Sequence, residues 1–223
     1  MKLVAKALIG AVLCGLAING VHAASGHEAS NSEAAGDAEA GKKKSVTCGA
    51  CHGADGNSMV PNFPKLAGQA ASYTFKQLKD MKSGARNVPE MAAIVAPLSD
   101  QDMMDLAAYF AEQTIKPGAA NPDLVELGQK LYRAGDAEKG VTACAGCHGA
   151  EGKGMPEAGF PALAGQHSAY LESQLKAFRA AGREDHDGKR RDNDGEGKMM
   201  RATAARLSDD DIKALSSYIS GMY

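Results

Sequence analysis

The sequence has no surplus of positive charge and, after its N-terminus, no long apolar run. No stretch beyond the first 23 residues approaches the roughly 20 apolar residues that a membrane helix needs. The 25 basic and 27 acidic residues give a formal net charge of −2. A nucleic-acid-binding surface requires a basic excess or a basic stripe, so we expect no nucleic-acid partner.

Cysteine is also scarce outside one repeated pattern. Of the five cysteines, Cys14 lies in the N-terminal apolar run, and the other four belong to two copies of Cys-x-x-Cys-His, at Cys48–His52 and Cys144–His148. No cysteine is left to build a disulfide framework. Each small domain must therefore gain stability elsewhere, and a buried cofactor that binds only the folded chain would supply it.

The two Cys-x-x-Cys-His motifs are typical of covalent c-type haem attachment. The thiols of Cys48 and Cys51, and those of Cys144 and Cys147, are spaced to add to the two vinyl groups of one haem. The histidine that follows each pair, His52 or His148, supplies an imidazole to the iron. Zinc binding or thiol redox chemistry fits either motif in isolation, but leaves the adjacent histidine unexplained. The sequence thus predicts two covalently bound haem c groups.

The N-terminus has the pattern of an export signal. A basic start with Lys2 and Lys6 precedes an apolar run from Ala7 to Ile18, and Val21-His22-Ala23 resembles a cleavage site. We expect residues 1–23 to be a signal peptide for Sec export to the periplasm, and residues 24–36, which are rich in small and polar residues, to be a flexible leader.

An internal repeat divides the remaining chain. Residues 51–56 match residues 147–152, and Phe63–Gln69 matches Phe160–Gln166 at an offset of 97. The offset then rises to 109, where Leu98-Ser99-Asp100 matches Leu207-Ser208-Asp209. The second copy therefore has 12 extra residues, which fall in the charged segment 182–198 and are expected to form a solvated loop. We predict two haem-binding domains at 37–116 and 123–223, joined by a Pro- and Gly-containing linker at 117–122.

Apolar spacing in both copies favours helices and an all-α fold. Ser99 and Ser208 are suited to cap the closing helices, because acidic residues follow each of them. The literal match of 37–39 with 136–138 is expected to be misleading, since a stronger helix pattern precedes the second motif. The expected helices before and after the motifs cover 37–45, 72–82, 123–133 and 168–181.

Two methionines occupy one position of the repeat despite the insertion. Met91 lies seven residues before Leu98, and Met200 lies seven before Leu207. We predict that these thioethers are the sixth ligands of the two irons, which would raise their reduction potentials. The competing interpretation is that they fill the core. Met199 is the alternative ligand beside Met200, and the unpaired methionines are expected to pack or lie on the surface.

Two prolines follow the motifs in a similar context. Pro64 lies 12 residues after His52, and Pro161 lies 13 after His148. Their carbonyls could accept a hydrogen bond from the Nδ1–H of each histidine and so orient the imidazole. A simple turn role is an equal alternative.

Other residues give weaker indications. The paired tyrosines of the repeat could touch a haem edge, although helix packing is the more common role. Residues 192–197 resemble the first half of a calcium loop, but Thr203 replaces the closing glutamate. His167 and His186 have no partner in the repeat and are expected on the surface. The tyrosines concerned are Tyr73, Tyr109, Tyr170 and Tyr218.

The haem motifs, the Phe-Pro-x-Leu-Ala-Gly-Gln segments and the methionines before Leu-Ser-Asp together resemble cytochrome c4, a dihaem member of the class I cytochromes c. The resemblance covers nearly all of residues 37–223. It implies two helical domains, each wrapped around one covalently attached haem, that face each other across a pseudo-twofold. It also implies electron delivery in the periplasm to a terminal oxidase, by a protein that is either free or in peripheral association with the membrane.

The expected function is therefore transfer of single electrons, without bond chemistry on a substrate. A quinol-oxidising complex or another donor would reduce the protein, and a terminal oxidase would accept the electron. The alternative is a dihaem subunit that accepts electrons from a dehydrogenase, such as a flavoprotein that oxidises sulfide. A dihaem peroxidase fits less well, because both irons are expected to have six ligands.

Overall fold

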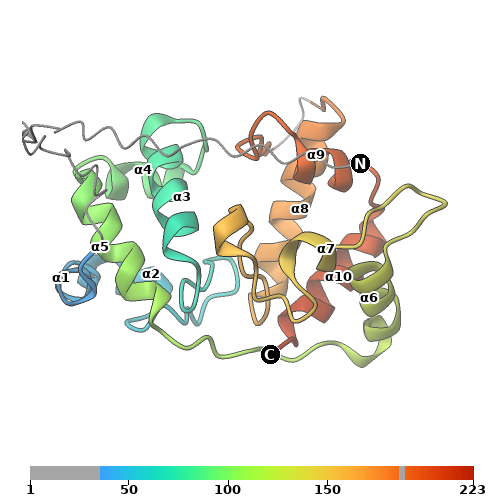
Figure 1. The fold of residues 1–223 in the computed structure, drawn as a ribbon, viewed down its shortest axis with the longest axis horizontal. Helices are drawn as coiled ribbons and strands as arrows, with labels where there is room; N and C mark the ends of the chain where they lie inside the picture. The colour runs from blue at the N-terminus through green and yellow to red at the C-terminus, as the bar shows by residue number, and fades with distance from the viewer. Residues whose placement is uncertain (1–35, 186–188) are drawn as a thin grey trace, which may run out of the picture. The chain divides into compact units, whose positions relative to one another are not determined.

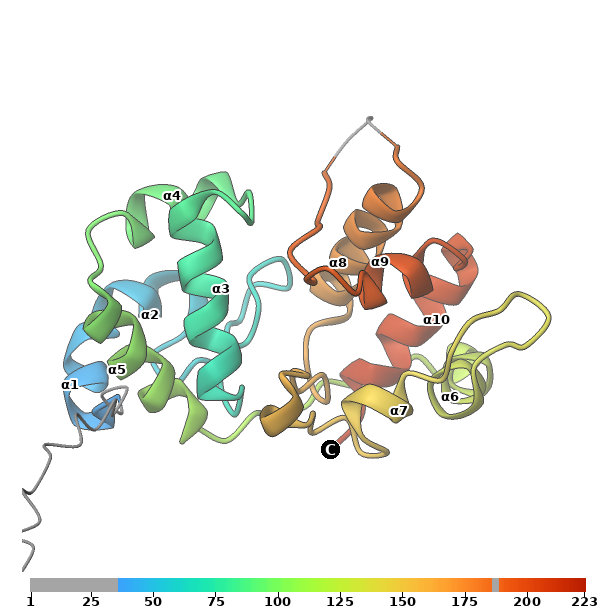
Figure 2. The ribbon, with the colours of Figure 1, turned by 45° about the horizontal axis from the view of Figure 1, so that its top comes forward.

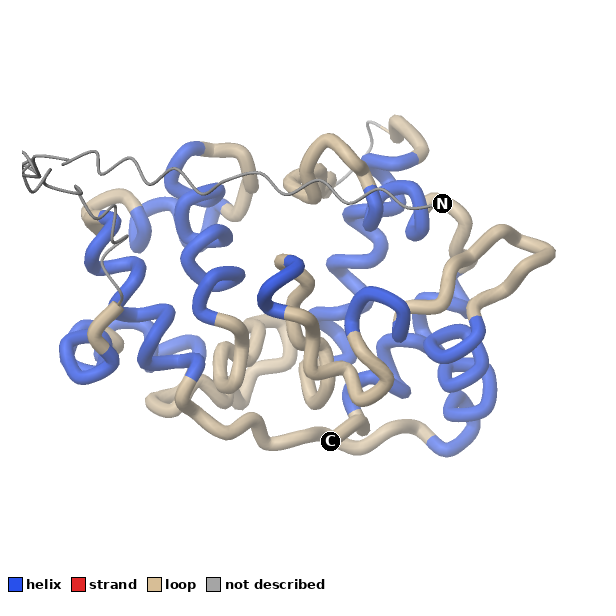
Figure 3. Tube along the Cα trace, viewed as in Figure 1, coloured by secondary structure: helices blue, strands red, loops and turns tan. Residues whose placement is uncertain are grey.

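The structure, a computed structural model, describes residues 36–185 and 189–223. Within these ranges every regular element is a helix, as the tube in Figure 3 shows, which confirms the all-α prediction. The signal peptide expected at 1–23, nearly all of the expected leader and His186 lie outside the described residues. The first half is taken below as residues 36–116 and the second half as residues 117–223.

The closing helix of each half, labelled α5 or α10 in Figure 1, begins with a serine cap. Helix α5 spans Asp100–Ala111, and α10 spans Asp209–Ser220. Ser99 accepts a hydrogen bond from the Asp102 N–H, and Ser208 accepts one from the Asp211 N–H, while both aspartates bond back to the capping residue. These reciprocal capping boxes satisfy N–H groups that have no partner inside the helix. The predicted serine caps are confirmed.

One helix packs closely on each closing helix through a glycine. Helix α1 spans Ala38–Lys44 and packs on α5, and α6 spans Pro122–Ala134 and packs on α10. A Cβ at Gly41 would lie 2.0 Å from the Asp105 carbonyl oxygen, and one at Gly128 would lie 2.4 Å from that of Ala214. Only glycine permits such an approach. Helices α1 and α6 are therefore the equivalent elements of the two halves.

The literal sequence match between 37–39 and 136–138 is indeed misleading. Asp37 caps α1 by accepting from the N–H groups of Glu39 and Ala40. Asp136 accepts in the same way from the N–H groups of Glu138 and Lys139, but in a turn closed by a bridge to Val141. Asp37 and Asp136 thus make the same local hydrogen bonds, but they do not occupy equivalent positions in the two halves.

The remaining helices place the haem motifs and the segments that face them. The motifs lie on α2 (Val46–His52) and at α7 (Ala145–His148). Helix α3 (Ala71–Ser83) corresponds to α8 (Ser168–Gly182). Helix α4 (Pro89–Val95) and α9 (Met199–Ala204) follow them, and a short 3-10 turn spans Pro156–Ala158.

A symmetric pair of glutamine side chains joins the two halves. The Gln69 amide donates to the Ala162 carbonyl at 2.9 Å and accepts from the Ala162 N–H at 3.0 Å. The Gln166 amide makes the same two bonds to Lys65, both at 2.8 Å. Because these residues are related by the offset of 97, the contacts form an internal pseudo-twofold.

The described part of the charged segment 182–198 is largely exposed, as predicted, but the side chains of Arg191 and Asp194 are buried. Figure 2 shows the chain leaving the end of α8 and returning along it before α9. Arg191 in this returning segment is only 8% exposed, and the Asp194 side chain is 6% exposed. Burial is possible here because the polar groups of these side chains are hydrogen-bonded to protein.

Candidate haem sites

The imidazole of His52 is held in one orientation by the backbone. His52 ends α2 and is buried, and its Nδ1 lies 2.8 Å from the Pro64 carbonyl oxygen. Since a carbonyl only accepts, Nδ1 must be the protonated nitrogen. Phe63 packs edge-on against the ring with centroids 6.2 Å apart. The lone pair of Nε2 is therefore free to bind a metal.

His148 repeats this arrangement in the second half. Its Nδ1 donates to the Pro161 carbonyl at 2.9 Å, and Phe160 packs edge-on at 6.2 Å. The proline-carbonyl prediction is confirmed in both halves. A hydrogen bond of this kind fixes the tautomer and the ring orientation of a metal-binding histidine.

Burial favours the neutral form of both imidazoles. Burial lowers the pKa of His52 and of His148, and the bond to the proline carbonyl only partly offsets this effect. The neutral imidazole is the form that binds iron. The environment therefore favours the ligating form.

The cysteines lie one helical turn apart and are free thiols. Cys48 and Cys51 share the face of α2, and Cys144 directly precedes α7, where Cys147 is found. Residues three apart on a helix are neighbours, so each pair can reach one planar group. Burial raises the pKa of Cys48, and it raises the pKa of Cys144 to about 11. Burial therefore favours the thiol over the thiolate at Cys48 and at Cys144.

Met91 and Met200 both lie in the first turn of a short helix. Met91 is on α4, Met200 is on α9, and each is half-buried. Met200 packs against the apolar core that Cys144 also contacts. The adjacent Met199 is 50% exposed, which favours Met200 as the inward-facing member of the pair. Ligation of iron by Met91 and Met200 stays a prediction.

Several other methionines lie where packing or surface roles were expected. Met103 is fully buried on α5, whereas Met59 is 90% exposed. Met155 is also on the surface. Met59 and Met155 are 96 residues apart, the same offset as the two haem motifs, so they share a position in the repeat, whereas the counterpart of Met103 is Ile212.

An unpartnered hydroxyl tests whether the first half suits a haem. Thr74 is buried on α3, and its Oγ1 has no hydrogen-bond partner in the described part of the chain. An interior polar atom without a partner is costly, so a group with acceptor atoms would complete this site. Haem c has carboxylates and fits that requirement. With the oriented histidines and free thiol pairs, the residues present match two covalently bound haems.

Two of the paired tyrosines bond to nearby protein groups. The Tyr109 hydroxyl donates to the Ala54 carbonyl, just after the first motif, at 2.9 Å. The Tyr218 hydroxyl accepts from Arg133 Nε at 3.3 Å. Each of these bonds ties the tyrosine of a closing helix to another segment of its own half.

The calcium-like segment uses its central carboxylate internally. Asp194 accepts from the backbone N–H and from Nε of Arg201, at 2.9 and 2.5 Å. In the ranges that the structure describes, no group of histidine, cysteine and acidic side chains is arranged to hold a metal ion. His167 bonds to Ser58 of the first half, so it is a contact between the halves and not a free surface residue.

Sequence reasoning missed Arg86 and Arg191, which meet between the halves. Arg86 lies five residues before Met91, whereas Arg191 lies nine before Met200. Relative to the two methionines, Arg191 is therefore four positions further away than Arg86, so an alignment on the methionines does not pair the two arginines. The signal that could have found it was the repeated Tyr and Gln of α3 and α8, whose polar side chains needed partners.

Comparison with known proteins agrees with the repeat and the geometry. A family model described as cytochrome c matches the chain twice, over residues 38–114 and 125–222. Cytochrome c4 of Pseudomonas aeruginosa is 51% identical over 184 residues, which are 82% of this chain and 88% of that protein. A Stutzerimonas stutzeri protein called thiosulfate dehydrogenase electron acceptor is 38% identical over 182 residues, with 80% of each chain covered.

The likeness extends to three dimensions. The crystal structure of reduced recombinant cytochrome c4 from Pseudomonas stutzeri matches with a TM-score of 0.79 at 50% identity. The match covers 85% of this chain and 100% of that one. Since both haem halves are included in these matches, the chain belongs to the cytochrome c4 family of dihaem c-type electron carriers, which are not enzymes.

Proposed function

We propose that this protein shuttles single electrons in the periplasm between a respiratory donor, such as a quinol-oxidising complex, and a terminal oxidase. His52 and Met91 would ligate one iron, and His148 and Met200 the other. The observation that supports this most directly is the repeated His–Pro hydrogen bond, combined with methionines at one position of both halves. When bound, the two haems supply reversible one-electron redox chemistry.

The residues of the chain favour electron transfer over substrate chemistry. The carbonyls of Pro64 and Pro161 fix the histidine rings. A thioether as the second axial ligand would raise the reduction potential and fill the position at which a small molecule could otherwise bind. A ligand set that is the same in both oxidation states requires little rearrangement, so electrons enter and leave quickly.

The proposed compartment rests on the sequence. The N-terminal 23 residues have the pattern of an export signal, and c-type attachment motifs fit an exported protein. Within the described residues, no helix combines the length and apolar character that a membrane crossing requires. Peripheral association with the membrane surface is part of the proposal only as a route to membrane-bound partners.

The ligand assignment is tested by absorption spectroscopy of the purified holoprotein. We expect two low-spin c-type haems per chain and a weak ferric band in the far red from sulfur-to-iron charge transfer. Met91→Ala and Met200→Ala should each remove about half of this band. Met59→Ala and Met199→Ala are matched controls, because both side chains are at least half exposed, and should leave it intact. A band that survives both ligand substitutions would contradict the assignment.

A second function is favoured by one relative. The Stutzerimonas stutzeri protein named as a thiosulfate dehydrogenase electron acceptor is 38% identical to this chain. We propose as the alternative that the chain accepts electrons from a dehydrogenase of a sulfur compound, including a flavoprotein that acts on sulfide. Tight co-purification with such a dehydrogenase, and reduction by it faster than by a quinol-oxidising complex, would favour this alternative.

A further inference from the structure

Arg191 is held firmly against α8 within its own half. Its backbone N–H donates to the Ala177 carbonyl at 3.1 Å, and its guanidinium lies 4.5 Å from the centre of the Phe178 ring. Its Nε donates to Asn193 Oδ1 at 2.9 Å. A cation over an aromatic face is a favourable contact that also limits the side chain to one rotamer.

Arg86 is fixed on the equivalent helix of the first half. Its backbone N–H donates to the Asp80 carbonyl at 2.9 Å, and Nη1 donates to Gln77 Oε1 at 2.8 Å. Its Nη2 then reaches the second half, where it donates to the Tyr170 hydroxyl at 2.9 Å and to Gln174 Oε1 at 3.0 Å.

Arg191 makes the same set of bonds with the halves exchanged. Its Nη1 donates to Gln174 Oε1 of its own half at 2.8 Å. Its Nη2 donates to the Tyr73 hydroxyl at 2.8 Å and to Gln77 Oε1 at 3.0 Å, both in the first half. We call these six residues the guanidinium clamp: Arg86, Arg191, Tyr73, Tyr170, Gln77 and Gln174.

The insertion adds contacts that have no equivalent in the first half. Asn193 Nδ2 donates to Gln77 Oε1 at 2.9 Å and to Asp80 Oδ2 at 2.6 Å, and Lys76 Nζ donates to the Asn193 carbonyl at 3.0 Å. Three positions of α3 are therefore held by a segment of the second half. The part of the insertion around Asn193 therefore contacts the first half directly.

The two guanidinium groups of the clamp share their acceptors. Arg86 and Arg191 both donate to Gln77 Oε1 and to Gln174 Oε1, one amide oxygen of each half. Gln77 and Arg191 are buried, and the other four members are half-buried. Each hydrogen bond adds a modest net free energy, but its preferred direction restricts how the two halves can lie.

We infer that Arg86 and Arg191 are positioning residues, which hold the two haem-bearing halves in one mutual orientation and thereby set the rate of electron exchange between them. The inference rests on the proposed function, because it requires an electron carrier at each site. Electron exchange falls steeply as two centres separate, so a fixed orientation protects the rate. The insertion supplies Arg191 and is what makes the clamp reciprocal.

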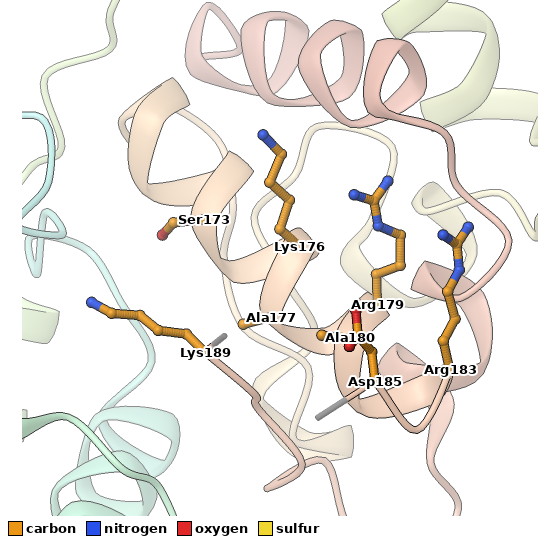
Figure 4. A pocket seen from close by; sticks show the side chains of 8 residues that line it. All are labelled: Ser173, Lys176, Ala177, Arg179, Ala180, Arg183, Asp185 and Lys189. Atoms are coloured by element: carbon orange, nitrogen blue, oxygen red, sulfur yellow. The ribbon is translucent and has the colours of Figure 1, made fainter. Parts of the chain in front are cut away.

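The clamp is distinct from the other arginines of this region. Figure 4 shows Arg179 on α8 and Arg183 just after this helix among the residues that line a surface pocket, with Lys189 on the other side. Both arginines donate to the Leu207 carbonyl within the second half, at 3.1 Å. Arg183 is thus a matched control, because it is an arginine near the same insertion whose side chain bonds to the Ala205 and Leu207 carbonyls of its own half.

The test compares Arg86→Met, Arg191→Met and Arg183→Met in the holoprotein. Methionine keeps much of the length of arginine and removes the guanidinium donors. Inter-domain order is measured by residual dipolar couplings of backbone amides, and inter-haem exchange by rapid half-reduction. In the parent protein we expect one alignment tensor for both halves. Each clamp variant should give two tensors and a several-fold slower exchange, whereas Arg183→Met should match the parent.

The outcomes separate this inference from the proposed function. If both clamp variants keep one tensor and the parent exchange rate, the inference is overturned even when the spectra show His/Met ligation. If the parent protein lacks the sulfur-to-iron band, the proposed methionine ligation is wrong. The comparison of alignment tensors still shows whether Arg86 and Arg191 fix the orientation of the two halves. If Arg191→Met does not fold, the double variant Tyr73→Phe/Tyr170→Phe removes only the two hydroxyl acceptors and should loosen the halves in the same direction.

Discussion

The two halves share one set of helices but fill their interiors differently. The second half has a continuous apolar core. Among the described residues, six buried apolar residues lie in the first half and fifteen in the second. The core of the second half consists of Leu131, Tyr132, Val141, Ala164, Leu171, Phe178, Ala204, Leu207, Ile212, Leu215, Ile219 and Met222.

Helix α3 shows the difference at single positions. Thr74 and Gln77 are its buried residues, whereas Leu171, the equivalent of Thr74, is part of the apolar core of the second half. Polar side chains contribute little hydrophobic free energy when they are buried. The first half therefore depends more on its haem for a stable interior, and the second half has more of its own.

The largest expected effect comes from removing one haem at a time. Cys48→Ala/Cys51→Ala should abolish attachment in the first half, and amide protection in α5 should fall to that of an unfolded chain, because the ligand that stabilises this half is lost. Cys144→Ala/Cys147→Ala should leave measurable protection in α10. Hydrogen exchange followed by mass spectrometry resolves the two helices. Equal loss of protection would show that the apolar core does not distinguish the halves.

A smaller effect is expected from one leucine at equivalent positions. Leu106 and Leu215 are related by the offset of 109, and both are buried. Leu215→Ala opens a cavity within a continuous core and should cost about 2–5 kcal/mol, whereas Leu106→Ala should fall at the lower end of the same range. Chemical denaturation of the two holoproteins measures the difference. A larger cost for Leu106→Ala would reverse the proposed comparison.

Features determined by nearby residues could be predicted from the sequence. The serine caps at Ser99 and Ser208 and the His–Pro hydrogen bonds depend on short segments with a fixed spacing. The helices around the motifs follow from apolar periodicity. Each of these patterns occurs in both copies of the repeat, and the structure agrees with the prediction in both halves.

Features that depend on where a loop returns could not be predicted. Arg191 lies in a segment whose composition is typical of a solvated loop, and its burial follows from acceptors on α3 and α8 that are more than ten residues away in sequence. The insertion also moves it out of register with Arg86. The difference between the two interiors could not be predicted either. Thr74 and Leu171 are equivalent positions of the repeat, and the sequence does not indicate that both are buried.

The smallest expected effect concerns an ionisable contact that is present on only one side of the pseudo-twofold. His167 Nε2 lies 2.8 Å from Ser58 Oγ and 2.9 Å from the Ser58 carbonyl, whereas its equivalent in the first half is Ala70. Ser58 Oγ donates to the Phe63 carbonyl, so His167 is the donor in both contacts. His167→Ala should cost about 1 kcal/mol at pH 7.5, the scale of one net hydrogen bond.

The pH dependence of this contact has a definite sign. Burial lowers the pKa of His167, and the nearby Lys65 ammonium lowers it further against the opposing bond to Ser58. The folded state therefore favours the neutral ring, so its stabilising effect is complete above the unfolded value of about 6.5 and is lost as the pH falls below it. Unfolding free energies of the parent holoprotein should decline between pH 7 and 5 more steeply than those of His167→Ala. If the unfolding free energies of the parent and of His167→Ala fell in parallel over this pH range, the contact between His167 and Ser58 would not contribute to the pH dependence.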